Sequence, residues 1–154
     1  MNTLRLILGD QLNYQHSWYK TISEPTIYCM FEMRQETDYV KHHIQKVVGF
    51  FAAMQEFKKY LMSQGHKIVY LTLDDSSNHQ NLEENLSSLI SSLGISKFEY
   101  QSPDEYRLDA QLKTICKTLE ITTQVIDSEH FYTNRDELSV FFKGKKQFLM
   151  ERFY

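Results

Sequence analysis

Residues 4–13 read LRLILGDQLN, an apolar run that stops at a glycine and continues with an aspartate and an amide. A continuous apolar run of this length is typical of a parallel strand that is covered on both faces of its sheet. In an open α/β sheet, ligands usually bind at the carboxyl end of the first strand. Asp10 is therefore either a ligand-binding carboxylate or the cap of the next segment, because aspartate favours helix caps and turns.

Strand-like and helical patterns alternate through the rest of the chain. Helical periodicity runs from about Thr37 to Ser63, and again through LEENLSSLISSL, and each pattern ends at a glycine that is followed by a strand. The expected strands are residues 4–8, 26–31, 67–73, 97–101 and 123–126. Strand–helix–strand units in series imply right-handed crossovers and a parallel sheet. We expect an α/β fold with a doubly wound, five-stranded parallel sheet in the order 3-2-1-4-5 and helices on both faces.

The helix expected over residues 37–63 carries an apolar face that includes Val40, Ile44 and Phe51. At 100° per residue a second, polar stripe lies beside that face, and His42 points nearly opposite to the apolar face. The stripe consists of Glu36, Tyr39, His43, Lys46 and Phe50. Such a stripe would line a pocket for a polar aromatic ligand. The alternative is an ordinary amphipathic helix whose shoulder residues reach into solvent.

Composition narrows the class of protein. The chain has 154 residues, which suits a single domain, and its 17 basic and 20 acidic residues give a net charge of −3. It therefore lacks the overall basic character of a protein that grips a phosphate backbone by itself. The two cysteines, Cys29 and Cys116, are far apart, so we expect no disulfide and a reducing, cytoplasmic location. Neither a signal-peptide pattern nor a run of about 18 apolar residues is present.

No familiar catalytic or phosphate-binding motif stands out. No GxGxxG follows the first strand and no P-loop motif occurs in the chain, which disfavours the usual dinucleotide and nucleotide sites. The pair Asp74–Asp75 after the third strand is typical of a turn. Arg107, just after the fourth strand, either pairs with a carboxylate or is solvated. These residues alone indicate a ligand-binding α/β domain without an evident catalytic device.

Five segments, taken together and in order, resemble one known family. They are LRLILGDQL at 4–12, EMRQETDYVKHH at 32–43, the pair 74–75, PDEYR at 103–107 and FLMERFY at 148–154. They resemble the amino-terminal domain of the deoxyribodipyrimidine photolyase-related proteins, the bacterial iron–sulfur photolyases and cryptochromes. The resemblance spans essentially the whole chain.

The resemblance implies a Rossmann-like domain that can hold an antenna chromophore, 6,7-dimethyl-8-ribityllumazine. It also implies a larger helical domain that binds FAD and a [4Fe–4S] cluster and either repairs (6-4) photoproducts in DNA by light-driven electron transfer or senses light. The family's antenna ligands correspond to Asp10, Glu36 and Lys46, and Met33 and Tyr39 lie in the matching segment. The resemblance thus favours Asp10 as a chromophore ligand, and it assigns no catalytic or metal-binding residue to this chain.

The resemblance also implies a domain division. We expect an antenna domain over residues 1–144, while 145–154 would begin a linker or helix to a missing FAD and iron–sulfur domain, because KKQFLMERFY starts an amphipathic segment that stops within one or two turns. Two unclustered cysteines cannot hold a four-cysteine cluster. Such a fragment would be inactive alone, would reach damaged DNA only through its full-length parent and would have no membrane partner. An exposed interface around Phe148, Phe153 and Tyr154 would favour self-association.

Two other functions stay open at this point. One is a stand-alone nucleotide- or flavin-binding module that acts through a partner, and the other is a scaffold whose pocket stays empty. The sequence leaves open whether a parent protein repairs DNA or signals.

Overall fold

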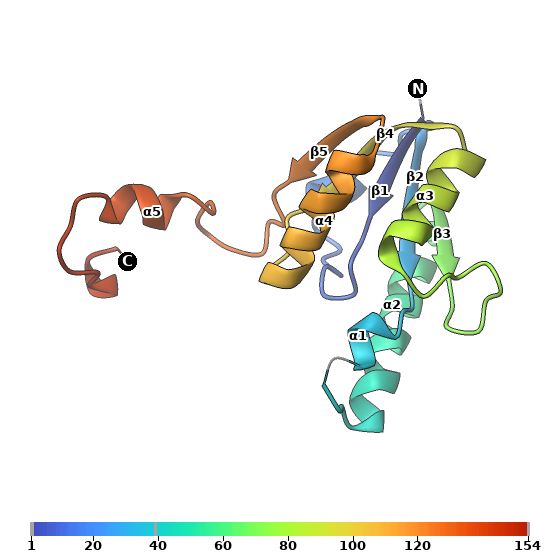
Figure 1. Ribbon diagram of the computed structural model, residues 1–154, viewed down its shortest axis with the longest axis horizontal. Helices are drawn as coiled ribbons and strands as arrows, with labels where there is room; N and C mark the ends of the chain where they lie inside the picture. The colour runs from blue at the N-terminus through green and yellow to red at the C-terminus, as the bar shows by residue number, and fades with distance from the viewer. Residues whose placement is uncertain (1, 39, 154) are drawn as a thin grey trace.

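A computed structural model describes residues 2–38 and 40–153, with the side chain of Glu36 left aside (Figure 1). Its strands are β1 (Asn2–Leu6), β2 (Thr26–Phe31), β3 (Lys67–Leu71), β4 (Ile95–Gln101) and β5 (Thr122–Ile126). They form one parallel sheet in the order β3-β2-β1-β4-β5, which confirms the predicted topology. Leu4 pairs with Ile27 of β2 and with Phe98 of β4, so β1 is the central strand.

Helices cover both faces of this sheet, as predicted. The helices are α1 (Gln35–Asp38), α2 (Ile44–Ser63), α3 (Leu82–Ser92), α4 (Tyr106–Thr118) and α5 (Glu137–Phe142), with short 3-10 turns η1 (Ser17–Tyr19) and η2 (Met150–Arg152). Figure 1 shows α3 and α4 on one face and α2 on the other. No helix of the described residues is long and apolar enough to cross a membrane.

The alternation of side chains along the strands builds two core layers. Leu4, Leu6 and Phe98 point to the face covered by α3 and α4, where they pack against Leu86 and Leu112. Tyr28 and Met30 point to the other face, together with Trp18 of η1 and the α2 residues Phe51, Met54, Phe57 and Leu61. Full burial of each large apolar side chain stabilises the fold by about 1.5–3 kcal/mol, so both layers are substantial.

The helix expected over residues 37–63 is in fact two helices, and this prediction was wrong at its amino-terminal end. Residues 40–43 are not helical. His43 adopts an extended backbone and its Nδ1 accepts a hydrogen bond from the amide of Gln45, so His43 caps α2. Val40 and Ile44, assigned to the buried face, are 53% and 67% exposed. A capping side chain that satisfies a free amide competes with continuation of the preceding helix.

The predicted helix ends are confirmed at two glycines. Gly65 after α2 and Gly94 after α3 have φ values of +90° and +58°, which favour glycine over other residues. After β5, the chain leaves the sheet, and α5 and η2 lie well to one side of the domain (Figure 1).

The loop between β3 and α3 is held by one buried amide. The Nδ2 atom of Asn78 donates to the carbonyl oxygens of Glu32, at 2.7 Å, and Thr72, at 2.8 Å. Its Oδ1 accepts hydrogen bonds from the amide of Gln80 and from Nδ2 of Asn85, both at 3.0 Å. Asn78 is only 8% exposed, so these partners have little access to water.

Substituting Asn78→Ala should therefore lower the free energy of unfolding by about 1–3 kcal/mol, which is the cost of leaving a buried polar group without its partner. Urea denaturation followed by circular dichroism measures this change. The neighbouring variant Ser76→Ala changes an exposed side chain and should stay within about 0.5 kcal/mol of the wild type. Equal stability of the two variants would contradict the structural role of Asn78.

Candidate functional site

A partly open cleft of about 170 Å³ lies at the carboxyl edge of the sheet. Three segments form it: the turn after β1, the region from α1 into the first turns of α2, and the start of α4. Its lining residues are Asp10, Thr37, His42, Lys46, Val47, Phe50, Glu105 and Leu108. The cleft therefore occupies the point where neighbouring strands, β2 and β4, lie on opposite sides of β1, which is the usual ligand position in such sheets.

The position of Asp10 is fixed by its neighbour Gln11, which is 1% exposed. Oε1 of Gln11 accepts a hydrogen bond from the amide of Leu8 at 3.1 Å, and its Nε2 donates to the carbonyl of Gln101 at 3.2 Å. One buried amide thus closes the turn after β1 and joins it to the end of β4. Asp10 lies in that turn and faces the cleft.

Phe50 forms an apolar wall of the cleft and depends on Gly9. A Cβ atom at Gly9 would overlap Cζ of Phe50 and lie 2.9 Å from Sδ of Met54. Glycine therefore lets the α2 side chains approach the backbone at the end of β1. Val47 and Leu108 complete the apolar surface.

The polar side of the cleft differs from the predicted helical stripe. His42, which was left out of the stripe, lines the cleft, and its Nδ1 lies 3.2 Å from Nζ of Lys46. His43, assigned to the stripe, instead caps α2. The stripe assumed one unbroken helix, and the break before Ile44 changes the directions of the side chains that precede it.

Two carboxylates face the basic groups across the cleft. Glu105 pairs with Arg107, which was one of the two outcomes expected for that arginine. Although Asp10 as a whole residue is exposed, the surrounding protein partly desolvates its carboxylate and raises its pKa. The negative charges of Asp104 and Glu105 act in the same direction, whereas its own backbone amide and His130 oppose it.

The structure brings together only part of the predicted site. Asp10 and Lys46 both line the cleft. Met33 is buried in the core at 2% exposure and lines a small internal cavity that also touches Phe50. The side chain of Glu36 and the whole of Tyr39 lie outside the described residues.

Sequence reasoning did not assign His42, Thr37 and Leu108 to the site, and it left the role of Gln11 open. For Gln11, the available signal in the sequence was an amide side chain directly after Gly9 and Asp10. The positions of His42 and Thr37 depend on where α1 ends, and the position of Leu108 depends on how close α4 lies to the turn after β1.

Other candidate groups have structural roles. Asp75 accepts hydrogen bonds from the amide and hydroxyl of Ser77, and Asp74 accepts one from Thr72, so this pair forms a turn as predicted. Cys29 is fully buried. Among the described residues, no group of three or more His, Cys, Asp or Glu side chains is placed to hold a metal ion.

The fold and the cleft together define a Rossmann-like, ligand-binding α/β domain. The family described as deoxyribodipyrimidine photo-lyase-related protein matches residues 5–154, and the chain belongs to this family. This finding confirms the resemblance seen in the five sequence segments.

The chain is also similar to a (6-4) photolyase of Agrobacterium fabrum (strain C58). The two are 28% identical over 156 residues, which covers 100% of this chain and 31% of that photolyase. The chain thus spans about a third of the length of this relative.

The raised pKa of Asp10 predicts a pH-dependent stability. Above the ordinary aspartate value of 3.8, the folded state binds more protons at Asp10 than the unfolded state does, so the stability contribution of Asp10 falls as pH rises. Asp10→Asn should stabilise the chain at pH 7, and the gain should vanish below pH 3.8. Urea denaturation across this pH range measures the effect.

Asp75→Asn is a control of opposite sign. The hydroxyl and amide of Ser77 lower the pKa of Asp75, so its carboxylate stabilises the fold above its ordinary pKa. Its removal should destabilise the chain at pH 7, and the loss should shrink as the pH falls through the lowered pKa. A gain at pH 7 for both variants would show that general charge removal, rather than the cleft, explains the result.

Proposed function

We propose that this chain is the antenna-binding domain of a light-driven photolyase-related protein and that its cleft binds 6,7-dimethyl-8-ribityllumazine. The observation that carries the proposal is the convergence of Asp10 and Lys46 on one cleft with an apolar wall at the carboxyl edge of β1. A flat heteroaromatic ring with polar edges matches this arrangement, because ligand sites combine apolar walls with a few placed polar groups.

The donor set fits the chemistry of a lumazine. The ring edge offers amide-like N–H and C=O groups. The Asp10 carboxylate can accept a hydrogen bond from an N–H group, and the Lys46 ammonium can donate one to a C=O group. Phe50, Val47 and Leu108 would cover the ring faces. The volume of about 170 Å³ is below that of sites that enclose a whole drug-sized ligand. We therefore expect the ring to enter the cleft and the ribityl chain to extend through its open side.

A [4Fe–4S] cluster does not fit the cysteine content of this chain. A [4Fe–4S] cluster needs four cysteine thiolates, and the sequence contains two cysteines, one of them buried. We propose that FAD and the cluster are held by a further domain, that residues 1–144 form the antenna domain and that 145–154 begin the connection. The full-length protein would then repair (6-4) photoproducts or act as a photoreceptor, with the antenna supplying absorbed light energy.

Binding of the lumazine should depend on Asp10 and Lys46. Titration of 6,7-dimethyl-8-ribityllumazine, followed by its fluorescence, should show saturable binding to the wild type. Asp10→Ala and Lys46→Ala should each weaken binding about 5- to 150-fold, because a lost buried hydrogen bond costs about 1–3 kcal/mol. Glu36→Ala tests the remaining carboxylate of the predicted set in the same way.

Lys59→Ala and Glu56→Ala are matched controls near the other end of α2, where these exposed side chains pair with each other at 2.6 Å. They should leave the affinity unchanged. Unchanged affinity in the Asp10 and Lys46 variants as well would refute the site, and absence of binding by the wild type would refute the antenna role of this chain.

The chain by itself should not repair DNA. Illumination of a (6-4) lesion with the 154-residue chain and added FAD should give no more repaired product than a sample without protein. The reason is that an electron donor must be held against the lesion, and we place the FAD that would donate the electron in the proposed further domain. Chromatographic analysis of the illuminated DNA measures this, and repair above background would contradict the domain division.

A further inference from the structure

The charges of this chain are divided unevenly between the sheet domain and its end. Residues 141–153, here called the basic segment, read FFKGKKQFLMERF and contain four basic residues, four phenylalanines and one acidic residue. The rest of the chain carries 13 basic and 19 acidic residues. The net charge of −3 for the whole chain therefore conceals a positive segment that is attached to a negative domain.

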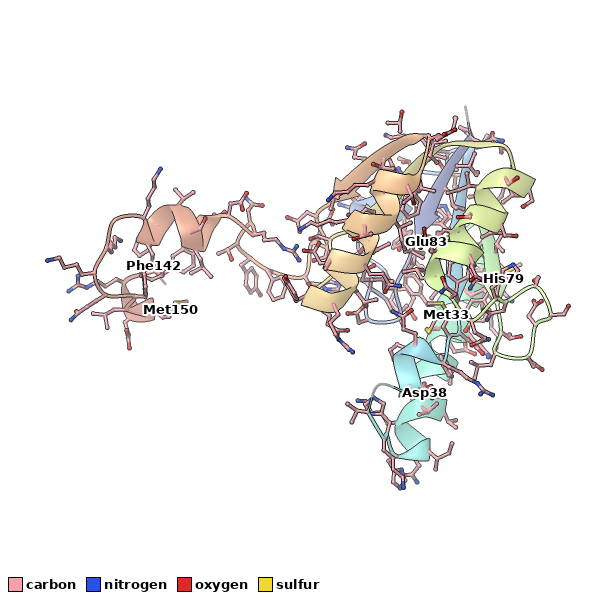
Figure 2. The ribbon with its side chains drawn as sticks, viewed as in Figure 1. Met33, Asp38, His79, Glu83, Phe142 and Met150 are labelled. Atoms are coloured by element: carbon pink, nitrogen blue, oxygen red, sulfur yellow. The ribbon has the colours of Figure 1, made fainter. Side chains whose placement is uncertain are left out.

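The basic segment is also separate in space. Figure 2 shows Phe142 and Met150 far to one side of Met33 and Glu83, which lie within the sheet domain. The polypeptide between them extends from β5 without covering the sheet (Figure 1). Most acidic residues of the domain are consequently distant from the basic segment, and Asp136 and Glu137 at the start of α5 lie beside it.

Four phenyl rings give the basic segment a compact form. Phe142 contacts Phe141 at a centroid distance of 5.0 Å and Phe148 at 5.3 Å, and Phe141 contacts Phe153 at 5.2 Å. Gly144, at a φ of +76°, turns the chain between Lys143 and Lys145. The aromatic contacts thus hold three lysines within one short turn.

The basic groups of this segment are available to an anionic partner. Lys143, Lys145, Lys146 and Arg152 are exposed, and none forms an ion pair with a carboxylate among the described side chains. Nζ of Lys145 lies 3.2 Å from the ring centroid of Phe141, a contact that orients the ammonium and leaves its charge in place. Elsewhere, lysines such as Lys59, Lys67 and Lys113 are paired with acidic residues.

We propose that the basic segment binds the phosphate backbone of DNA, independently of sequence and of any lesion. Clustered lysine and arginine side chains with interleaved aromatic residues are the pattern of a backbone-binding element. The separation of the segment from most of the acidic domain lowers the repulsion that the net charge of the chain would otherwise impose, because salt screens charges that lie more than about 8–10 Å apart. This contact is distinct from the cleft and would add non-specific affinity to whatever lesion recognition a full-length protein provides.

An anionic membrane is the less fitting partner. Helices that lie in a membrane interface present a continuous apolar face over many residues. The α5 helix has six residues, and the phenyl rings of Phe141, Phe142 and Phe153 are turned toward one another. A phosphate backbone requires only the exposed charges.

The test is fluorescence anisotropy of a labelled, undamaged duplex with the 154-residue chain. Wild type should bind in the range of about 10⁻⁴–10⁻⁶ M, and with four cations engaged the logarithm of the affinity should fall with a slope of about −3 to −4 against log salt. The triple variant Lys143→Glu, Lys145→Glu, Lys146→Glu should bind at least about tenfold more weakly, with a slope near −1.

A second triple variant, Lys20→Glu, Lys59→Glu, Lys117→Glu, changes the net charge by the same amount on exposed positions of the sheet domain. It should keep most of the affinity and the steep slope. Equal losses in both triple variants, no binding by the wild type, or binding to phosphatidylserine vesicles in place of DNA would each overturn the proposal. Lumazine titration of the first triple variant should match the wild type, so failure here and failure of the antenna role are distinguishable.

Discussion

The buried amide of Gln11 is the interaction on which the geometry of the site depends. It bonds to the backbone at the end of β1 and at the end of β4, and so ties together the ends of two neighbouring strands of the sheet. Because both hydrogen bonds are shielded from water, their loss would leave backbone groups unsatisfied. The turn that carries Asp10 is therefore held at the centre of the carboxyl edge, and the cleft forms where α2 and α4 approach it.

The break between α1 and α2 shapes the other side of that cleft. His42 lies just before the capped start of α2, and its Nδ1 is 3.2 Å from Nζ of Lys46 in the first turn of that helix. The same break leaves Val40 and Ile44 exposed. The cap that His43 forms at the start of α2 thus sets which of the preceding side chains face the cleft.

The proposed chromophore site and the basic segment are physically separate parts of the chain. The cleft combines opposite charges at close range with apolar walls, which suits a small neutral ring with polar edges. The basic segment carries one sign of charge at an exposed position, which suits a polyanion. Membership of the photolyase-related family is consistent with both, since one would serve light absorption and the other DNA contact.

The sequence by itself determined the sheet order, the helix ends at Gly65 and Gly94, the turn at Asp74–Asp75 and the family, because these depend on local periodicity, on backbone preferences and on the order of short segments. The resemblance also selected Asp10 and Lys46, and both line the cleft. Tertiary structure decided the roles of His42, Gln11 and Leu108 and the separation of the basic segment. Those features depend on where a helix breaks and on contacts between residues as far apart as Gln11 and Gln101, and no local pattern contains that information.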